Sequence, residues 1–265
     1  MKRLVLLSVL VIAVLAIGAC APAAEEEWVV TVAVENQYIP FNYLNGQTGE
    51  PEGWDYDVWE EICNRLGCTV EFVEASWEGM IQAVADGQWD AAGDGITITD
   101  ERAEIVDFSI GYISLEQRLI VRTTDDRISS IDDIVADESL KLGTQGGTTN
   151  YEVATKYLPE ERISAFETFP FAVQAVVSGD IDAAIIDDVA GQGYVGENSE
   201  ALKLVGDSLS SDWLGFIYPK GSELKGPVDD VLREMMGDGF LDALNLKYFG
   251  PEFTITYDDI QFPEE

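Results

Sequence analysis

The stretch GDGITITDER, residues 93–102, places a basic side chain where helix electrostatics disfavour it. Thr99 can cap a helix that starts at the next residue, so Arg102 falls in the first turn, near the partial positive charge of the helix N-terminus. An anion should therefore compensate Arg102. That anion is either a neighbouring acidic side chain in a surface salt bridge, or the carboxylate of a ligand, which a guanidinium binds with two parallel hydrogen bonds.

Other polar groups extend this pattern. Gly95 lets a ligand approach the backbone, and the Thr97 hydroxyl can accept from an ammonium or donate to a carboxylate. The stretch GTQGGTTNYE, residues 143–152, opens a helix whose free N–H groups can bind an anion, or it is an ordinary glycine turn with a threonine N-cap. Asp187, at a strand end, can pair with a cation or cap the next helix. A buried zwitterion needs both charges paired, so these groups suit a free α-amino acid.

Alternating strands and helices must position these groups. The first segments are expected to form strand, helix, strand, helix and strand over residues 28–35, 55–67, 69–74, 76–87 and 89–96. Gly67 stops the first helix, and Ser76 is the expected N-cap of the second. This order predicts a parallel sheet covered by helices. The pattern then restarts, with strands expected over 115–122, 140–145 and 181–187, helices over 130–137, 148–158 and 171–179, and two closing helices over 227–238 and 239–249.

Two segments of the chain echo each other. ADGQWDAAGDG and VSGDIDAAIIDD share a helix end, a glycine, two residues and then Asp-Ala-Ala on a strand, so Asp90 matches Asp182. Five residues later the strands end at Gly95 and Asp187. The ligand crevice of an open parallel sheet lies beyond the carboxyl ends of its strands. Two such units facing each other would form a cleft between lobes, although so short an echo can also arise by chance.

Composition excludes several classes of protein. The chain has 50 acidic and 15 basic residues and a formal net charge of −35, which argues against nucleic acid as a partner. It has no histidine and three cysteines, so we expect neither a zinc site nor any other metal or cofactor. With 46% apolar residues, 265 residues can bury a substantial core in one large domain or two small ones.

The N-terminus has the features of an export signal. Lys2 and Arg3 precede an apolar run from Leu4 to Ile17, which is short for a membrane span and ends in IGAC. This ending resembles a bacterial lipobox, which predicts a lipoprotein signal peptide over residues 1–20, lipidation of Cys20 and a tether over 21–27. The protein would then be exported and held at the cell surface or in the periplasm by its lipid anchor. The alternative is an ordinary signal peptide with a chance cysteine.

Cys63 and Cys68 have two interpretations. Export favours a disulfide between them, but residues five apart on an unbroken helix point apart, so the chain would have to turn at Gly67. Otherwise they are two small buried apolar side chains.

The motifs together resemble a known family, the extracellular solute-binding proteins of polar-amino-acid ABC transporters, which have the type-II periplasmic binding fold. The resemblance covers nearly all of residues 28–250, and its most specific part is GITITDERAEIVDFS with the downstream GTT. Further matches are VENQYIPFNY, GWDYDVWEEICNRLG, SGDIDAAIIDD and LKYFG. It implies an α/β protein of two lobes, each a parallel-rich sheet flanked by helices, joined by two hinge strands. Lobe 1 would comprise residues 28–114 plus 219–265, and lobe 2 residues 118–212.

The resemblance also implies roles for individual residues. Arg102 would bind the ligand carboxylate, helped by Thr97 and Thr149. The ligand ammonium would meet Gly95, Thr97 and Asp187. The residues expected around the ligand side chain are Tyr38, Trp77, Glu35, Asp94 and Gln145. Tyr38 and Trp77 would be the aromatics that sandwich it, although without the family they would be taken for core or turn residues.

Asp94 departs from the small or hydroxyl residue usual at its position in the family. Two carboxylates beside two aromatics favour a basic side chain, through ion pairing and cation–π contact. A neutral ligand such as glutamine is the second choice, and glutamate is disfavoured because no spare basic residue falls at these positions.

The resulting functional hypothesis is a monomeric, membrane-anchored binding protein without enzymatic activity. It would capture a polar, basic amino acid and deliver it to the permease subunits of an ABC transporter. Two alternatives remain open at this point: a dehydratase-like enzyme on the same fold, with Glu35 or Asp94 as acid or base, and a ligand sensor that acts through a separate receptor.

Overall fold

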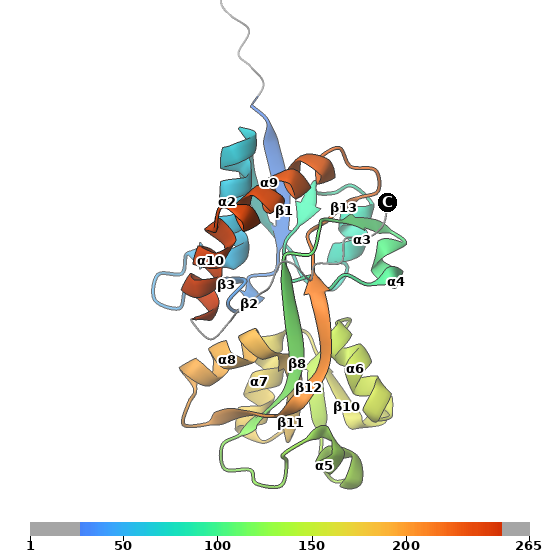
Figure 1. The fold of residues 1–265 in the computed structure, drawn as a ribbon. Helices are drawn as coiled ribbons and strands as arrows, with labels where there is room; N and C mark the ends of the chain where they lie inside the picture. Colours follow the sequence, from blue (N-terminus) through green and yellow to red (C-terminus); the bar gives the residue numbers. More distant parts are fainter. Residues whose placement is uncertain (1–26, 251–265) are drawn as a thin grey trace, which may run out of the picture.

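The computed structural model describes residues 27–250, which form two lobes stacked end to end (Figure 1). The two-lobed α/β fold expected from the sequence is confirmed. The predictions for residues 1–20, for the lipidation of Cys20, for most of the tether and for residues 251–265 lie outside the described residues. No helix between residues 27 and 250 is long and apolar enough to cross a membrane.

Lobe 1 is built on a five-stranded sheet in the order β5-β1-β6-β13-β7. Its strands are β1 (Val29–Val34), β5 (Thr69–Glu74), β6 (Ala91–Ala92), β7 (Val106–Phe108) and β13 (Ile217–Pro219). Its helices are α2 (Trp54–Leu66), α3 (Met80–Ala85), α4 (Asp100–Ala103), α9 (Lys225–Gly237) and α10 (Phe240–Phe249). β1 pairs in parallel with β5 and β6, whereas β13 runs antiparallel to its neighbours. The last two helices, α9 and α10, pack on α2 of lobe 1.

Lobe 2 repeats the plan with the order β10-β9-β11-β8-β12. Its strands are β8 (Ile113–Arg122), β9 (Leu142–Gln145), β10 (Ile163–Phe166), β11 (Ala183–Asp187) and β12 (Leu202–Leu214). Its helices are α5 (Ile131–Ala136), α6 (Thr149–Tyr157), the 3₁₀ turn η1 (Glu160–Arg162), α7 (Phe169–Ser178) and α8 (Asp188–Glu197). Strands β9, β10 and β11 pair in parallel, while β8 runs antiparallel to β11 and β12.

The lobes are joined by the long antiparallel pair of β8 and β12, which runs from one lobe to the other (Figure 1). A small sheet of β2 (Gln37–Tyr38), β3 (Asn42–Leu44) and β4 (Pro51–Glu52) lies on lobe 1 where it faces lobe 2. The lobe boundaries expected at 114/118 and 212/219 stay predictions. β8 spans the first of them, and β12 ends just beyond residue 212.

Local sequence signals explain most element ends. Gly67 stops α2 in the left-handed conformation, with φ of 78°, which a residue with a Cβ adopts reluctantly. Thr148 caps α6, since its hydroxyl accepts from the backbone N–H of Tyr151 at 3.2 Å. The expectation for Ser76 is wrong: α3 begins at Met80, because Gly79 has φ of 85° and cannot continue a helix. The preceding residues instead make a turn that leaves Trp77 at the cleft.

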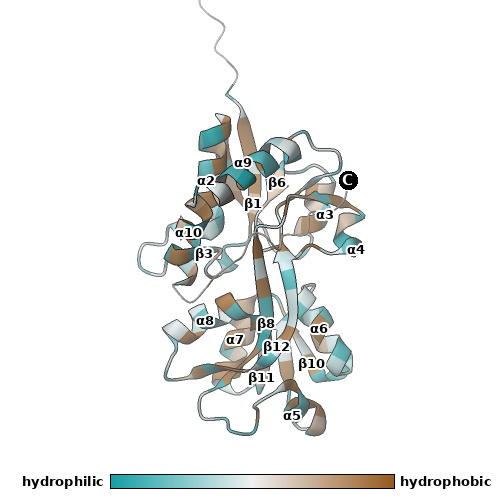
Figure 2. Ribbon diagram, in the orientation of Figure 1, coloured by the Kyte–Doolittle hydropathy of each residue, from teal (hydrophilic) through white to brown (hydrophobic). Residues whose placement is uncertain are grey.

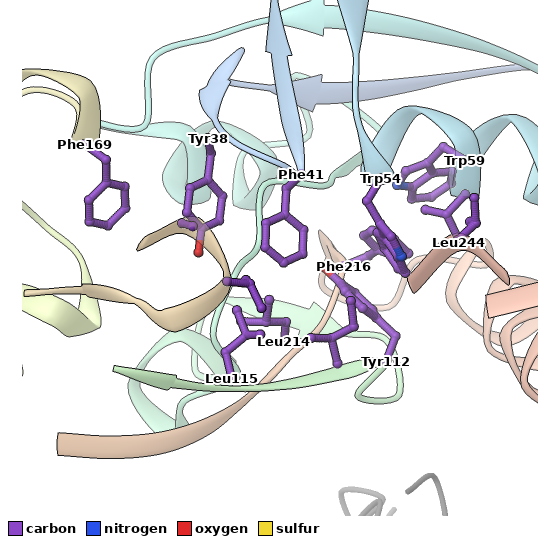
Figure 3. Close-up of a cluster of buried hydrophobic side chains, with 14 of the residues drawn as sticks. Tyr38, Phe41, Trp54, Trp59, Tyr112, Leu115, Phe169, Leu214, Phe216 and Leu244 are labelled. Carbon is purple, nitrogen blue, oxygen red and sulfur yellow. The ribbon is translucent and has the colours of Figure 1, made fainter. Parts of the chain in front are cut away.

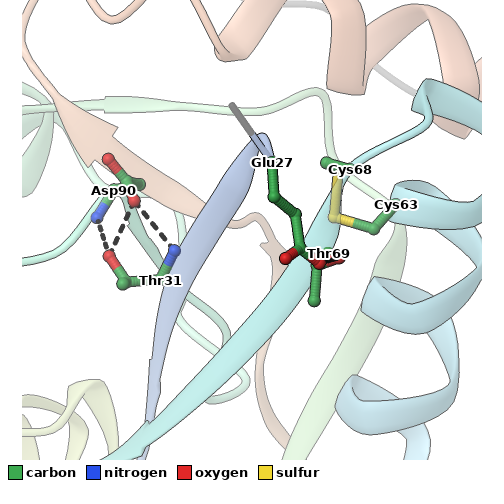
Figure 4. The surroundings of a disulfide bond; sticks show 6 residues. All are labelled: Glu27, Thr31, Cys63, Cys68, Thr69 and Asp90. Atoms are coloured by element: carbon green, nitrogen blue, oxygen red, sulfur yellow. Dashed lines mark hydrogen bonds between the residues drawn. A yellow bond between two sulfur atoms is a disulfide. The ribbon is translucent and has the colours of Figure 1, made fainter. Parts of the chain in front are cut away.

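The repeated Asp-Ala-Ala segments occupy equivalent places. Asp90 immediately precedes β6 and accepts from the backbone N–H of Thr31 in β1 at 2.8 Å (Figure 4). Asp182 likewise immediately precedes β11. It accepts from the backbone N–H of Lys141, the residue before β9, at 2.9 Å. In each lobe the aspartate thus ties one strand start to its parallel neighbour. The echo reflects a shared strand-anchoring device at the end of the sheet opposite the cleft.

Apolar side chains fill both lobes. Figure 2 shows β1 as an almost continuous apolar strand, while α2 and α9 carry both polar and apolar residues, as helices with one buried face do. A row of aromatic rings runs through lobe 1 to the cleft and includes Trp54, Phe41 and Tyr38 (Figure 3). This row places packed aromatic side chains directly behind the surface of the cleft.

Cys63 and Cys68 are joined in a disulfide at the C-terminal end of α2 (Figure 4). Their Cα atoms are 4.6 Å apart, because the chain reverses at Gly67 and the backbone N–H of Cys68 donates to the carbonyl of Cys63 at 3.0 Å. The turn at Gly67 thus provides the geometry that the sequence spacing alone left undecided.

Candidate functional site

A cavity between the lobes contains all ten residues that the family resemblance assigned to ligand binding. About 330 Å³ of non-atom space lies between these residues, and part of it is open to solvent. The contributions of lobe 1 are Glu35, Tyr38, Trp77, Asp94, Gly95, Thr97 and Arg102, and those of lobe 2 are Gln145, Thr148, Thr149, Asn150, Phe169 and Asp187. The structure therefore brings together, from segments far apart in sequence, every residue expected there.

Arg102 is nine-tenths buried and its guanidinium forms no ion pair among residues 27–250. Its position in α4 is fixed by Thr99, whose hydroxyl accepts from the Arg102 backbone N–H at 3.2 Å. One guanidinium nitrogen donates to the Thr97 carbonyl at 3.0 Å. Burial lowers the pKa of Arg102 from its ordinary value, although the group stays charged. The surface salt bridge considered above is thus absent from the described residues, and a buried cation faces the cavity without an anion.

Trp77 lies against this arginine. The guanidinium carbon is 5.3 Å from the centre of the Trp77 ring, within the range of a cation–π contact. The indole N–H donates across the cleft to the carbonyl of Gly147 in lobe 2, at 3.2 Å. Trp77 therefore both holds the guanidinium in place and links the two lobes.

Two threonines meet beside Arg102. The hydroxyls of Thr97 in lobe 1 and Thr149 in lobe 2 are 3.2 Å apart. Gln117, on hinge strand β8, donates to the Thr149 hydroxyl at 3.0 Å. Each hydroxyl has one hydrogen, so while one donates to the other, a single O–H is left for a ligand carboxylate held by the arginine.

Asp187 occupies the N-cap position of α8, but its side chain caps nothing. One of its oxygens accepts from the hydroxyl of Tyr38 in lobe 1, and the other accepts from Asn150 at 3.0 Å. Partial removal from water raises the pKa of Asp187 to about 6, against these hydrogen bonds, which lower it. The side chain is therefore aimed into the cleft, where it can meet an ammonium group.

Glu35 and Asp94 form a second acidic region in the same cavity. Gln145 of lobe 2 donates to both Glu35 oxygens, at 3.0 and 3.3 Å. Asp94 Oδ1 accepts from Asn42 at 2.7 Å and from the Glu35 backbone N–H at 3.3 Å. Both carboxylates are buried, and neither has a basic side chain within 4 Å among the described residues.

Burial sets the protonation of this acidic region. It raises the pKa of Asp94 well above the ordinary value, and the nearby Glu35 charge raises it further. Burial also raises the pKa of Glu35, partly offset by the hydrogen bond from Gln145. A cation entering the cavity would favour the ionised form of both groups, so its binding should release protons.

Tyr38 makes different contacts from those expected of a side-chain sandwich. Its ring lies in a row between Phe41 and Phe169, with centroid separations of 5.0 and 5.5 Å (Figure 3). Phe169, at the start of α7 in lobe 2, was not singled out from the sequence, where FPFAVQ has only the signature of a buried helix. Asn150, Thr148 and Asn42 were likewise not assigned to the site from the sequence. A polar residue at a helix N-terminus beside GGTT was the available signal for Asn150.

The residues from 27 to 250 contain no cluster of histidine, cysteine, aspartate or glutamate arranged to hold a metal ion. The site instead presents a guanidinium, hydroxyls and carboxylates to a small polar ligand enclosed between two hinged lobes. Fold and site together define a two-lobed solute-binding protein.

Comparison with known proteins identifies the family. Residues 30–251 match the model of the bacterial extracellular solute-binding proteins, family 3, and the chain belongs to that family. The L-cystine-binding protein TcyJ of Escherichia coli strain K12 is 28% identical over 232 residues, which cover 87% of this chain and 86% of TcyJ.

Two solved structures are also similar. One is the arginine-, lysine-, histidine-binding protein ArtJ from Geobacillus stearothermophilus, with a TM-score of 0.78, 30% identity and coverage of 84% of this chain and 96% of ArtJ. The other is AncCDT-1, an ancestral amino acid-binding protein and a precursor of cyclohexadienyl dehydratase. It has a TM-score of 0.77, 34% identity and coverage of 83% of this chain and 95% of AncCDT-1.

Proposed function

We propose that this protein captures a free amino acid with a basic side chain between its lobes and delivers it to the permease of an ABC importer. One observation carries the proposal: among residues 27–250, a single cavity holds a buried arginine without an ion pair and three carboxylates, Glu35, Asp94 and Asp187, without a basic side chain within 4 Å. Uncompensated buried charges are costly, so a ligand that supplies one anion and two cations would stabilise every charged group in the cavity.

Arg102 is the proposed partner of the ligand carboxylate, with the hydroxyls of Thr97 and Thr149 as additional donors. The guanidinium has five N–H groups, and only one hydrogen bond to protein is formed by them among the described residues. Donors therefore remain for two parallel bonds to a carboxylate. Asp187, with Gly95 and Thr97, is the proposed site of the α-ammonium.

Glu35 and Asp94 are the proposed partners of the ligand side chain, with Gln145 and Trp77 beside them. A basic side chain would neutralise this region, while an acidic one would add a further negative charge to it. ArtJ, whose fold matches this chain, is an arginine-, lysine- and histidine-binding protein. Its ligand class supports the same assignment.

Hinged closure is the proposed mechanism of capture. Four residue pairs are hydrogen-bonded across the cleft at the cavity, and they join Glu35 to Gln145, Tyr38 to Asp187, Trp77 to Gly147 and Thr97 to Thr149. Outside the cavity, Tyr194 of lobe 2 donates to the Gln37 carbonyl of lobe 1. The connecting strands β8 and β12 adjoin the cavity, since Gln117 of β8 donates to Thr149 and Leu214 of β12 pairs with Thr97. Rotation at those strands would separate the four pairs together and open the site to solvent.

A thermal-shift panel of the twenty amino acids, followed by calorimetry, tests the proposal. A ligand that binds only the folded protein must raise the melting temperature, and arginine or lysine should give the largest shift. Arg102→Ala should abolish that shift and leave the unliganded melting temperature nearly unchanged. The matched control Arg65→Ala removes a surface guanidinium from α2 and should bind normally. Tighter binding of glutamate or leucine than of arginine would contradict the assignment.

We also propose that the protein binds its ligand without converting it chemically. Glu35 and Asp94 have raised pKa values and could act as general acids, and AncCDT-1 is a precursor of a dehydratase. Incubation with a cyclic, prephenate-like acid and chromatography of the mixture decides this point, and we expect the substrate to be recovered unchanged.

Anchoring at Cys20 is proposed from the sequence IGAC, in which small residues follow the apolar run and precede the cysteine. Labelling with a radioactive fatty acid should mark the wild-type protein and leave Cys20→Ser unlabelled. A labelled variant would exclude Cys20 as the modified residue.

A further inference from the structure

Behind the ligand-facing carboxylate of Asp94 lies a second carboxylate, Asp55, and one amide joins them. The Nδ2 group of Asn42 donates to Asp94 Oδ1 at 2.7 Å and to Asp55 Oδ2 at 2.8 Å. Asn42 and Asp55 are both fully buried, and neither lines the cavity. Their contact with the site is through Asp94.

The backbone fixes the orientation of this amide. Asn42 Oδ1 accepts from the backbone N–H of Asn36 at 2.7 Å, so Nδ2 must face the two carboxylates. The first turn of α2 holds the same segment, because the N–H of Asp55 donates to the Phe41 carbonyl at 2.8 Å. The N–H of Trp54 similarly donates to the Pro40 carbonyl at 3.0 Å. Asn42 and Asp55 are thus held in one register by backbone hydrogen bonds on both sides.

This arrangement distinguishes the two oxygens of Asp94. Oδ1 accepts from Asn42 and from the Glu35 backbone, whereas Oδ2 accepts no hydrogen bond from residues 27–250. Because Asp94 lines the cavity, the oxygen left for a ligand is Oδ2. If the carboxylate could rotate freely, either oxygen could face the cavity, and neither would be held ready for a ligand.

The electrostatic surroundings of the pair are almost entirely acidic or neutral. Asp94 is influenced by Glu35 at the end of β1 and by Asp55 from α2. Asp55 in turn influences Tyr112, from the segment before β8, and its neighbour Tyr56. Burial raises the pKa of Asp55 to about 7, and its Oδ1 has no hydrogen-bond partner among the described residues. Asp55 is therefore able to change its charge near neutral pH, just behind the ligand-facing acid.

We propose that Asn42 and Asp55 are positioning residues that set the preference of the site for cationic over neutral side chains. Asn42 does so by holding Asp94 Oδ1 and presenting Oδ2 to the ligand, and Asp55 by the negative charge it places behind Asp94. This inference rests on the proposed function, because it assumes that Asp94 faces a basic side chain.

Arginine and citrulline are suitable probes, because citrulline has nearly the same shape without the positive charge. The measured quantity is the ratio of the citrulline Kd to the arginine Kd, determined by calorimetry from pH 5 to pH 9. A loss of folding stability weakens the binding of both ligands equally and leaves this ratio unchanged. A change in the orientation or charge of the Asp94 carboxylate alters the ratio. Asn64→Leu, on the exposed face of α2, is the matched control for Asn42→Leu.

We expect Asn42→Leu to lower the ratio at least about tenfold. Asp55→Asn keeps an acceptor for the Asn42 amide but removes the charge, so it should lower the ratio at pH 8 and leave it unchanged at pH 5. The direction follows because the Asp55 carboxyl carries its charge only above its pKa of about 7. This second variant decides the question if Asn42→Leu does not fold.

The outcomes separate the two proposals. A wild-type ratio near one would overturn the basic-ligand assignment and this inference with it. A large wild-type ratio that Asn42→Leu leaves unchanged, or an Asp55→Asn pH profile identical to the wild type, would overturn the inference alone.

Discussion

Gln145 of lobe 2 reaches across the cleft and donates to both carboxylate oxygens of Glu35 in lobe 1, at 3.0 and 3.3 Å. The same amide group donates to the Glu167 carbonyl at 3.0 Å, so its position is fixed within lobe 2. The contact exists only when the lobes are together. It therefore couples closure of the cleft to the acid that we assign to the ligand side chain.

Replacing this residue tests that coupling. Gln145→Leu removes both donors with little change in volume and leaves Glu35 facing an apolar side chain. Since a lost hydrogen bond to a charged group costs about 1.5–3 kcal/mol, affinity for arginine should fall roughly tenfold or more. Small-angle scattering should also show a smaller compaction on ligand addition. Gln82→Leu, on the exposed side of α3, should behave as the wild type. Unchanged affinity in Gln145→Leu would mean that the interlobe bond contributes nothing to capture.

Protonation of Asp187 should limit binding in mild acid. Its pKa is raised to about 6, above the ordinary value of 3.8, because the folded protein removes it from water. Because folding raises this pKa, the protonated side chain stabilises the fold at pH values below the pKa of the unfolded state. This contribution is lost as pH rises through about 6. Ligand binding has the opposite dependence, because an ammonium needs the ionised carboxylate. The contribution of Asp187 to affinity should be level above pH 7 and fall by up to about tenfold per pH unit below 6.

Calorimetric titrations from pH 4.5 to pH 8 measure this profile. The step near pH 6 should be missing in Asp187→Asn, which should also bind more weakly at every pH. Glu35 and Asp94 have raised pKa values too, so some weakening in acid should persist in that variant. If the variant retains the full step near pH 6, another group is responsible for it.

Sequence patterns located most of the site because its residues belong to local motifs. Thr99 lies three residues before Arg102, and the glycines lie directly before Thr148 and Thr149, so each motif is local. In the structure both motifs begin a helix, capped by Thr99 and Thr148. The assignment of these residues to one cavity needed the family resemblance. No local rule could bring residues 97 and 149 within hydrogen-bonding distance.

What the sequence did not reveal depends on long-range packing. The segment LKLVGDSLSSDWL has the serines, glycine and aspartates of a loop, yet it forms β12. Pairing with β8 along most of its length, across an irregularity between Val205 and Ser210, overrides that local preference. Likewise, the Tyr38 ring stacks on Phe169, 131 positions away, because closure brings α7 against β2. No local signal marked Asn42, because its partner Asp55 lies 13 residues further along the chain.

The disulfide at the end of α2 should contribute to stability and not to ligand binding. The loop from Cys63 to Cys68 is short, so its closure entropy predicts a loss of only about 2 kcal/mol in the free energy of unfolding for Cys63→Ala/Cys68→Ala. The start of α2 at Trp54 approaches the site, but Cys63 lies nine residues further along the helix, about 14 Å away at 1.5 Å per residue. Urea denaturation should show the loss, while the Kd for arginine stays unchanged. A weakened Kd would indicate that α2 transmits strain to the site.

A methyl group at Gly95 should block the closed site. Gly95 has φ of 57°, and a Cβ there would lie 2.3 Å from Cε1 of Tyr38. The ring cannot move aside easily, because it lies between Phe41 and Phe169 and its hydroxyl donates to Asp187. Gly95→Ala should therefore lower arginine affinity more than about 100-fold and destabilise the fold by about 1–3 kcal/mol. Gly146→Ala is the matched control, since a Cβ there meets its nearest atom at 3.5 Å, an ordinary contact. Calorimetry and urea denaturation on both variants provide the test, and equal affinities would show that Tyr38 is free to leave its stack when a ligand binds.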